Sequence, residues 1–277
     1  MQAINPIGVF DSGVGGLTVA SEVMKQLPNE RIIYFGDTAR VPYGNKSKKA
    51  IIKYSKQIVN FLLEKNVKGI VIACNTASAF ALDEIISQVS IPIIGVIEPG
   101  AKTAAYVTKY NNIGIIGTKS TINSGMYQHL LNKTNPKVMV HEKACPLFVP
   151  LVEEGWINDP ITFDVARRYL EDFIEIDIDT LVLGCTHYPL LRDTIGSVLG
   201  EKVTLVNPAY ETAKTLKNVL NNKGVESSQL SDQHEFYVSD GVDQFNTFAN
   251  GILPHYLKNA KEVNIDDYSD IINGEKT

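Results

Sequence analysis

The chain has 277 residues, of which 44% are hydrophobic and 21% are charged, and its formal net charge is −5. This composition is typical of a globular protein, and the acidic balance argues against a surface for nucleic acid or anionic membranes. No apolar stretch reaches the length of a membrane span and no secretory signal opens the sequence. We therefore expect no membrane contact and a cytoplasmic protein whose thiols stay reduced.

Short apolar runs and amphipathic stretches alternate along the chain. We expect strands over residues 7–10, 31–35, 70–74, 91–97, 113–117, 181–185, 235–239 and 263–265, and helices over 17–27, 47–65, 76–88, 101–110 and 243–256. The dipeptide Pro99-Gly100 is expected to break the pattern, which then restarts. Alternation of this kind predicts an α/β protein with mainly parallel strands and helices on both faces.

The two series of elements resemble each other. Residues 7–12 (IGVFDS) resemble residues 113–118 (IGIIGT), and in each series a later strand ends at a cysteine at a similar distance. We predict two similar doubly wound lobes related by a pseudo-twofold. The first consists of residues 1–98 with 207–277, and the second of residues 99–206. Since ligands bind at the carboxyl ends of parallel strands, the active site is expected in the cleft between the lobes.

Two cysteines have matching surroundings in these two series. Cys74 and Cys185 each end a buried apolar strand. Each is followed by residues that favour a helix start, which are Asn75 and Thr76 after the first and Thr186 and His187 after the second. A helix N-terminus stabilises a thiolate and lowers the pKa of a cysteine. The pairing predicts two acid/base groups that face each other across a cleft.

The third cysteine lacks such surroundings. Cys145 precedes Pro146 in an apolar stretch, and we expect it to be a buried, inert thiol. The three cysteines form no CxxC pair, and the five histidines give no metal-ligand spacing with them. We therefore expect no metal site.

Polar residues gather where the expected strands end. Asp11 opens a glycine-rich turn (residues 11–16) that lacks the G-x-G-x-x-G pattern and the Gly-Lys-Ser/Thr of a P-loop. Its backbone N–H groups suit a small carboxylate instead. Glu153 follows an apolar run, and His187 is placed to hold a thiolate or carry a proton. These residues alone leave open both proton transfer at carbon and attack of one cysteine on an amide or ester.

Six segments carry a resemblance to a known family. They are residues 7–19 (IGVFDSGVGGLTV), 36–44 (GDTARVPYG), 73–78 (ACNTAS), 94–101 (IGVIEPGA), 148–153 (FVPLVE) and 184–191 (GCTHYPLL). Together they resemble the bacterial glutamate racemases of the aspartate/glutamate racemase superfamily, from about residue 7 to residue 257. The chain departs from the family pattern at Val41, where members often carry cysteine, and at Asn207-Pro208, where many have an Asp-Ser pair.

The resemblance implies a racemase that needs no cofactor and interconverts L-glutamate and D-glutamate, supplying D-glutamate for peptidoglycan. By the family pattern, Cys74 removes the α-proton of D-glutamate and Cys185 that of L-glutamate. The residues that would assist them are Asp11, Glu153 and His187. The substrate-binding residues would be Asp11, Ser12, Pro42, Tyr43, Gly44, Asn75, Thr76, Thr118, Thr121, Thr186 and His187. The strand-end motifs contain no Lys or Arg, so hydroxyl and backbone N–H groups would anchor the substrate. The resemblance also suggests a homodimer.

Three alternatives remain open beside this interpretation. The first is an aspartate or hydantoin racemase of the same superfamily, which relative rates on glutamate and aspartate would distinguish. The second is a single-cysteine amidase or hydrolase that uses Cys185 and His187 and does not need Cys74. The third is an amino-acid-binding protein, which would bind its ligand without exchanging the α-hydrogen.

Overall fold

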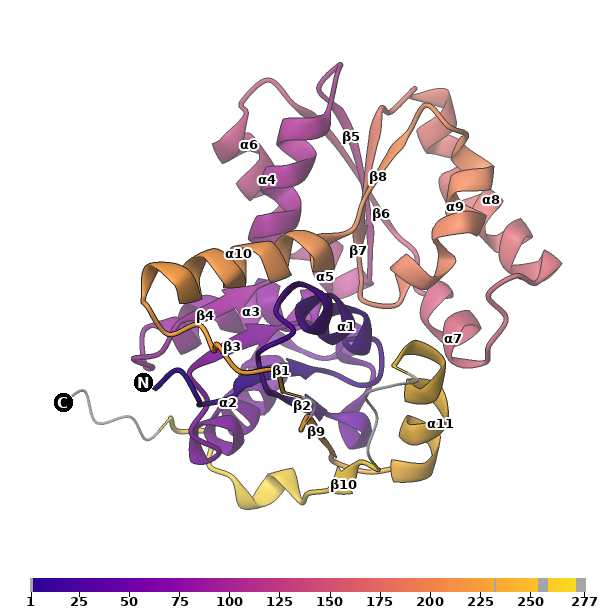
Figure 1. Cartoon of the computed structure of the whole chain (residues 1–277). Helices are drawn as coiled ribbons and strands as arrows, with labels where there is room; N and C mark the ends of the chain where they lie inside the picture. Colours follow the sequence, from indigo (N-terminus) through magenta and orange to yellow (C-terminus); the bar gives the residue numbers. More distant parts are fainter. Residues whose placement is uncertain (1, 232, 254–258, 273–277) are drawn as a thin grey trace.

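The strands of the computed structural model form two parallel sheets (Figure 1). The structure describes residues 2–231, 233–253 and 259–272. The first sheet has the order β10-β9-β2-β1-β3-β4, and its strands are β1 (Ile7–Asp11), β2 (Ile32–Gly36), β3 (Gly69–Ile72), β4 (Ile93–Gly95), β9 (Glu235–Val238) and β10 (Lys261–Glu262). The second has the order β6-β5-β7-β8, and its strands are β5 (Asn112–Gly117), β6 (Met139–Ala144), β7 (Thr180–Gly184) and β8 (Thr204–Val206).

The two sheets repeat one topology. In the first, β1 lies between β2 and β3, with β4 outside β3, and in the second, β5 lies between β6 and β7, with β8 outside β7. Every pairing between described strands is parallel, which confirms the predicted α/β fold class. All residues of β1, β3 and β7 are buried, as expected for parallel strands that are covered on both faces. Cys74 and Cys185 follow the third strand of their respective sheets.

Helices cover both faces of both sheets. They are α1 (Leu17–Gln26), α2 (Lys48–Glu64), α3 (Asn75–Ile86), α4 (Ile97–Val107), α5 (Lys119–Asn123), α6 (Met126–Thr134), α7 (Phe148–Glu153), α8 (Pro160–Glu175), α9 (Arg192–Leu199), α10 (Pro208–Asn222) and α11 (Val242–Ile252). The buried clusters of the first sheet include α1, α10 and α11 on one face and α2 and α3 on the other. Those of the second sheet include α4 and α6 on one face and α7, α8 and α9 on the other.

Local sequence explains where these helices begin. The Ser47 side chain accepts a hydrogen bond from the Ala50 N–H at 3.3 Å, so it caps α2 close to the predicted start. Ile51, Ile58 and Leu62 then lie on one buried face of this helix, at the spacing that the helical period requires.

The expected break at Pro99-Gly100 is wrong, because both residues lie inside α4. Pro99 occupies the first helical turn, where a missing N–H group leaves no hydrogen bond unmade. A Cβ atom added at Gly100 would lie 2.9 Å from Cγ of Pro208, so glycine lets α4 pack closely against the start of α10.

The C-terminal elements also differ from their predicted bounds. The strand expected over 263–265 lies at Lys261–Glu262, and Ile265 begins a short 3₁₀-helix that Asn264 caps. The helix expected over 243–256 is α11, which ends at Ile252, and residues 254–256 of that prediction lie outside the described residues.

Helix α10 lies between α1 of the first sheet and α4 of the second (Figure 1). The division into lobes of residues 1–98 with 207–277 and of residues 99–206 stays a prediction, and residues 1, 232, 254–258 and 273–277 of the first lobe lie outside the described ranges. No described helix combines the length and apolar character needed to cross a membrane.

Candidate active site

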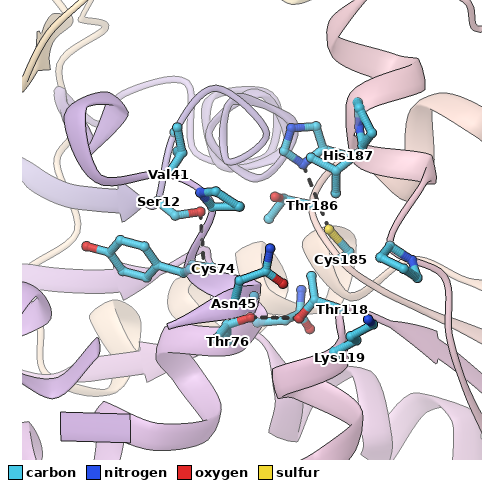
Figure 2. Close-up of a pocket in the computed structure, with 18 of the residues that line it drawn as sticks. Ser12, Val41, Asn45, Cys74, Thr76, Thr118, Lys119, Cys185, Thr186 and His187 are labelled. Carbon is cyan, nitrogen blue, oxygen red and sulfur yellow. Dashed lines mark hydrogen bonds between the residues drawn. The ribbon is translucent and has the colours of Figure 1, made fainter. Parts of the chain in front are cut away.

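One pocket of about 300 Å³ lies at the carboxyl ends of strands from both sheets. The predicted site residues that line it are Ser12, Pro42, Tyr43, Gly44, Cys74, Asn75, Thr76, Thr118, Glu153, Cys185, Thr186 and His187. Figure 2 shows Cys74 and Cys185 on different sides of this pocket. The sequence-predicted residues Asp11 and Thr121 do not line it, and both lie buried behind its wall.

Cys74 itself caps α3, in place of the expected Asn75 or Thr76. Its sulfur accepts a hydrogen bond from the Ala77 N–H at 3.5 Å, and its thiol donates to Oγ of Ser12 at 3.7 Å (Figure 2). The expected lowering of its pKa is wrong. Burial, followed by the charge of Asp11, raises the pKa of Cys74 to about 12, and this outweighs the stabilisation by Ala77 and Ser12. Cys74 is therefore a neutral thiol at neutral pH.

Cys185 has different surroundings, despite its matching place in the topology. The predicted helix start is confirmed with His187 in the N-cap position, but the helix is a 3₁₀-helix (Tyr188–Leu191) that precedes α9. Its sulfur lies 3.8 Å from Nδ1 of His187, whose Nε2 lies 2.9 Å from Oε1 of Glu153. These contacts form a chain from the thiol to a carboxylate at the C-terminal end of α7.

His187 is the positively charged member of this chain. Burial lowers its pKa, but the hydrogen bonds to Cys185 and Glu153 outweigh burial and raise the pKa of His187 to about 10. The imidazole is therefore an imidazolium at neutral pH. A positive charge at this position stabilises negative charge that develops on the neighbouring sulfur.

Asp11 occupies the glycine-rich turn that the sequence placed at the site. Its Oδ2 atom accepts hydrogen bonds from the N–H groups of Gly13 at 3.1 Å and Gly16 at 3.0 Å. The turn therefore binds its own carboxylate, so the N–H groups of Gly13 and Gly16 do not face a ligand as expected. Burial raises the pKa of Asp11, while the charge of His187 and the backbone hydrogen bonds lower it.

The hydroxyls of three threonines, from segments that follow strands of both sheets, lie close together at the pocket wall. The hydroxyl oxygens of Thr76, Thr118 and Thr121 lie 3.0 Å from one another. Thr76 belongs to α3, whereas Thr118 caps α5. Thr76 and Thr118 line the pocket, while Thr121 closes the triangle from behind, where it can orient the other two hydroxyls.

The fold of this chain agrees with that of known proteins. A family model described as Asp/Glu/Hydantoin racemase matches residues 16–216. The chain belongs to this family. A glutamate racemase of Geobacter metallireducens is 48% identical over 262 residues, covering 94% of this chain and 97% of that protein. A crystal structure of a glutamate racemase from Bacillus anthracis has a TM-score of 0.91, with 42% identity over 94% of this chain and 97% of that one. Another, from Francisella tularensis in complex with D-glutamate, has a TM-score of 0.90, with 39% identity over 96% of this chain and 100% of that one.

Tyr43 of this racemase-family chain presents its ring and backbone to the pocket rather than its hydroxyl. The Tyr43 O–H donates to Oδ2 of Asp37, which is fully buried. Asp37 also accepts hydrogen bonds from Arg40 and Ser239. Since the hydroxyl is held there, the parts of Tyr43 that face the pocket are its ring and backbone.

The pocket is also lined by residues that were not among the predicted site residues, namely Gly13, Val41, Asn45, Lys119, Pro146, Val149 and Pro150. Lys119 corrects the expectation that the strand ends supply no Lys or Arg, because it lines the pocket directly after Thr118 (Figure 2). Its position beside a predicted strand end was the signal that could have identified it. Among the described residues, no group of three or more His, Cys, Asp or Glu side chains is arranged to hold a metal ion.

The racemase-family site makes stability depend on pH through His187. The pKa of histidine is about 6.5 in an unfolded chain, and it is raised to about 10 in the folded protein. The contribution of protonated His187 to the stability of the folded protein is therefore complete below about pH 6.5 and is lost as the pH rises towards 10. We expect the free energy of unfolding to fall between about pH 6.5 and 8.5, by up to about 1.4 kcal/mol per pH unit.

Urea unfolding of the wild type and of His187→Asn across this range measures the effect. The window ends near pH 8.5 because buried thiols, whose pKa values are also raised, contribute above the unfolded thiol pKa of about 8.5. In His187→Asn, the free energy of unfolding is expected to depend much less on pH across this range. An equal slope in both proteins would contradict the assignment of an imidazolium.

Proposed function

We propose that the protein is a cofactor-independent glutamate racemase that interconverts L-glutamate and D-glutamate by proton transfer between two cysteines. The observation that carries the proposal is the placement of Cys74 and Cys185, which follow equivalent strands of two sheets and line one pocket from different sides. Racemisation needs a base on one face of the α-carbon and an acid on the other, and this arrangement supplies one thiol for each face.

In the proposed reaction, the Cys185 thiolate removes the α-proton of L-glutamate, and the Cys74 thiol delivers its proton to the opposite face. The products are D-glutamate, a Cys185 thiol and a Cys74 thiolate, and the D-to-L reaction runs the same steps in reverse. Because the raised pKa of Cys74 keeps its thiol protonated at neutral pH, a proton is present for delivery in the L-to-D direction. The imidazolium of His187 supports negative charge on Cys185.

The pocket suits a substrate with two carboxylates and one ammonium group. The hydroxyls of Ser12, Thr76, Thr118 and Thr186 line it, together with the amide of Asn75. Lys119 adds a cation, and Glu153 adds an anion. The related Francisella tularensis protein was crystallised in complex with D-glutamate, which supports the choice of substrate. By the same proposal, the enzyme is cytoplasmic, forms a homodimer and supplies D-glutamate for peptidoglycan.

The test is to incubate the purified protein with L-glutamate in deuterium oxide without added cofactor. Polarimetry follows racemisation, and proton NMR follows loss of the α-hydrogen signal. We expect the optical rotation to fall to zero while deuterium enters the α-position. Exchange with aspartate but not with glutamate would favour the aspartate racemases of the superfamily, and no exchange with either would contradict the proposal.

A second candidate function is supported by the chain Cys185–His187–Glu153, which has the order of the thiol nucleophile, the histidine and the orienting carboxylate in cysteine hydrolases. An amidase of this kind would release ammonia from glutamine without α-hydrogen exchange. It would also remain active as Cys74→Ser, which distinguishes it from a two-thiol racemase.

A further inference from the structure

Tyr127 of α6 contacts the chain neighbours of both pocket cysteines, although it does not line the pocket itself. Its side chain is almost fully buried, with 1% of its surface exposed. Its hydroxyl reaches Asn75, the residue after Cys74, and its ring lies against Gly184, the residue before Cys185. The elements involved belong to different sheets, so Tyr127 connects the two sides of the pocket.

The contact with Asn75 sets the direction of an amide group. The Tyr127 O–H donates to Oδ1 of Asn75 at 2.7 Å. Burial raises the pKa of Tyr127, so the hydroxyl keeps its proton and stays a donor. With Oδ1 held in this way, the Nδ2 amide group is turned to the other side, where no described residue accepts its protons. Since Asn75 lines the pocket, these protons are available to an acceptor on a ligand.

The contact with Gly184 holds the end of β7. A Cβ atom added at Gly184 would lie 3.1 Å from Cε2 of Tyr127 and 2.6 Å from the backbone oxygen of Ile116. The ring therefore packs directly against the backbone that leads into Cys185. A shift of the Tyr127 ring would therefore displace the backbone at Gly184, because packed interiors leave no free space for the ring to move.

We propose that Tyr127 is a positioning residue of the racemase site, which acts through Asn75 by turning the amide N–H groups towards a substrate carboxylate. The inference rests on the proposed function, because it assigns the Asn75 amide to binding of that substrate. The ring of Tyr127 meanwhile keeps the Cys185 segment at a constant distance from the start of α3. Neither role requires Tyr127 to touch the substrate.

Tyr127→Phe tests the hydroxyl alone, because it keeps the ring against Gly184. The KM for glutamate is expected to rise about tenfold in both directions, as for one hydrogen bond to a charged group. The value of kcat should stay within about twofold, since the proton-transferring groups are unchanged. Tyr188→Phe is the matched control, because Tyr188 is also fully buried and donates to a backbone carbonyl, that of Cys145, at 2.9 Å. Its KM should equal that of the wild type.

A double-mutant cycle with Asn75→Ala separates positioning from a general structural effect. If Tyr127 acts through Asn75, Tyr127→Phe raises KM in the wild type but not in the Asn75→Ala background. Equal increases in both backgrounds, or an equal increase in Tyr188→Phe, would overturn the inference. The wild-type assay under the same conditions keeps the two proposals apart. Absence of wild-type racemisation contradicts the proposed function, whereas a wild-type KM in Tyr127→Phe contradicts only the role of Tyr127.

If Tyr127→Phe is unstable, Asn75→Asp tests the same inference and leaves Tyr127 unchanged. A carboxylate at position 75 can still accept the Tyr127 hydrogen bond, but it presents an oxygen where the amide presents N–H groups. We expect KM to rise at least as much as in Asn75→Ala, because an anion would face the substrate carboxylate. A KM equal to that of the wild type would show that the orientation of the amide is irrelevant and would overturn the inference.

Discussion

Replacing Cys74 or Cys185 with serine is expected to lower the rate of glutamate racemisation by about 10³-fold in each case. A serine hydroxyl is a far weaker base than a thiolate and a far weaker acid than a thiol, so either substitution removes proton transfer on one face. Both directions should lose activity, because each turnover of the proposed mechanism uses one sulfur as the base and the other as the acid. The structure supports this expectation by placing both residues on the wall of one pocket.

The measurement is the initial rate of change in circular dichroism, starting from each enantiomer. Proton NMR in deuterium oxide adds a check, because a variant with one intact thiol can still exchange the α-hydrogen of one enantiomer. Cys145→Ser is the matched control, since Cys145 is buried but absent from the pocket lining, with its sulfur 3.8 Å from the backbone oxygen of Lys143. Full turnover by Cys74→Ser or Cys185→Ser would contradict the two-thiol mechanism.

Gly15→Ala is expected to lower kcat/KM by about 100-fold, although Gly15 does not line the pocket. A Cβ atom added there would lie 2.4 Å from Oγ1 of Thr186 and 2.5 Å from Cε1 and Nδ1 of His187. Real carbon atoms do not approach so closely, so both side chains must move. His187 would then leave its place beside Cys185, and Thr186 would leave the pocket wall.

The kinetic constants of Gly15→Ala should be measured together with its thermal unfolding midpoint, because overpacking also destabilises by about 1–3 kcal/mol. Gly196→Ala is the matched control. Gly196 lies within α9, where an added Cβ atom meets only Leu205 at an ordinary 3.7 Å. Alanine there should raise stability slightly through its higher helix propensity and leave the kinetics unchanged. Wild-type kinetics in Gly15→Ala would mean that the position of His187 does not matter for the reaction.

These predictions depend on an asymmetry between two thiols that occupy equivalent places in the topology. Cys74 is buried beside Asp11 and holds its proton, whereas Cys185 has an imidazolium beside it. One side of the site is therefore prepared to donate a proton and the other to carry negative charge. This asymmetry is consistent with the proposal that Cys185 removes the proton of L-glutamate.

The sequence by itself indicated that strands and helices alternate and at which end of a strand each pocket cysteine lies, although it did not delimit β6 or β8. These features are local, because apolar runs form buried strands wherever both faces are covered, and the residue after such a strand lies at the carboxyl edge. The motifs around Cys74 and Cys185 also indicated the family, and they did so without any knowledge of tertiary contacts. Pro99-Gly100 misled the same local reasoning, because proline is tolerated in the first turn of a helix.

Only the tertiary structure decided which polar groups line the pocket and which are held by the protein. The turn after β1 binds Asp11 with its own N–H groups, and Tyr43 gives its hydroxyl to Asp37. Tyr127 meets Asn75 across 52 positions of sequence. The pKa of Cys74 likewise rises because of burial, which outweighs the local effect of the helix N-terminus. Hydrogen-bond partners and desolvation depend on which residues lie together after the two sheets pack, and sequence spacing alone does not encode that proximity.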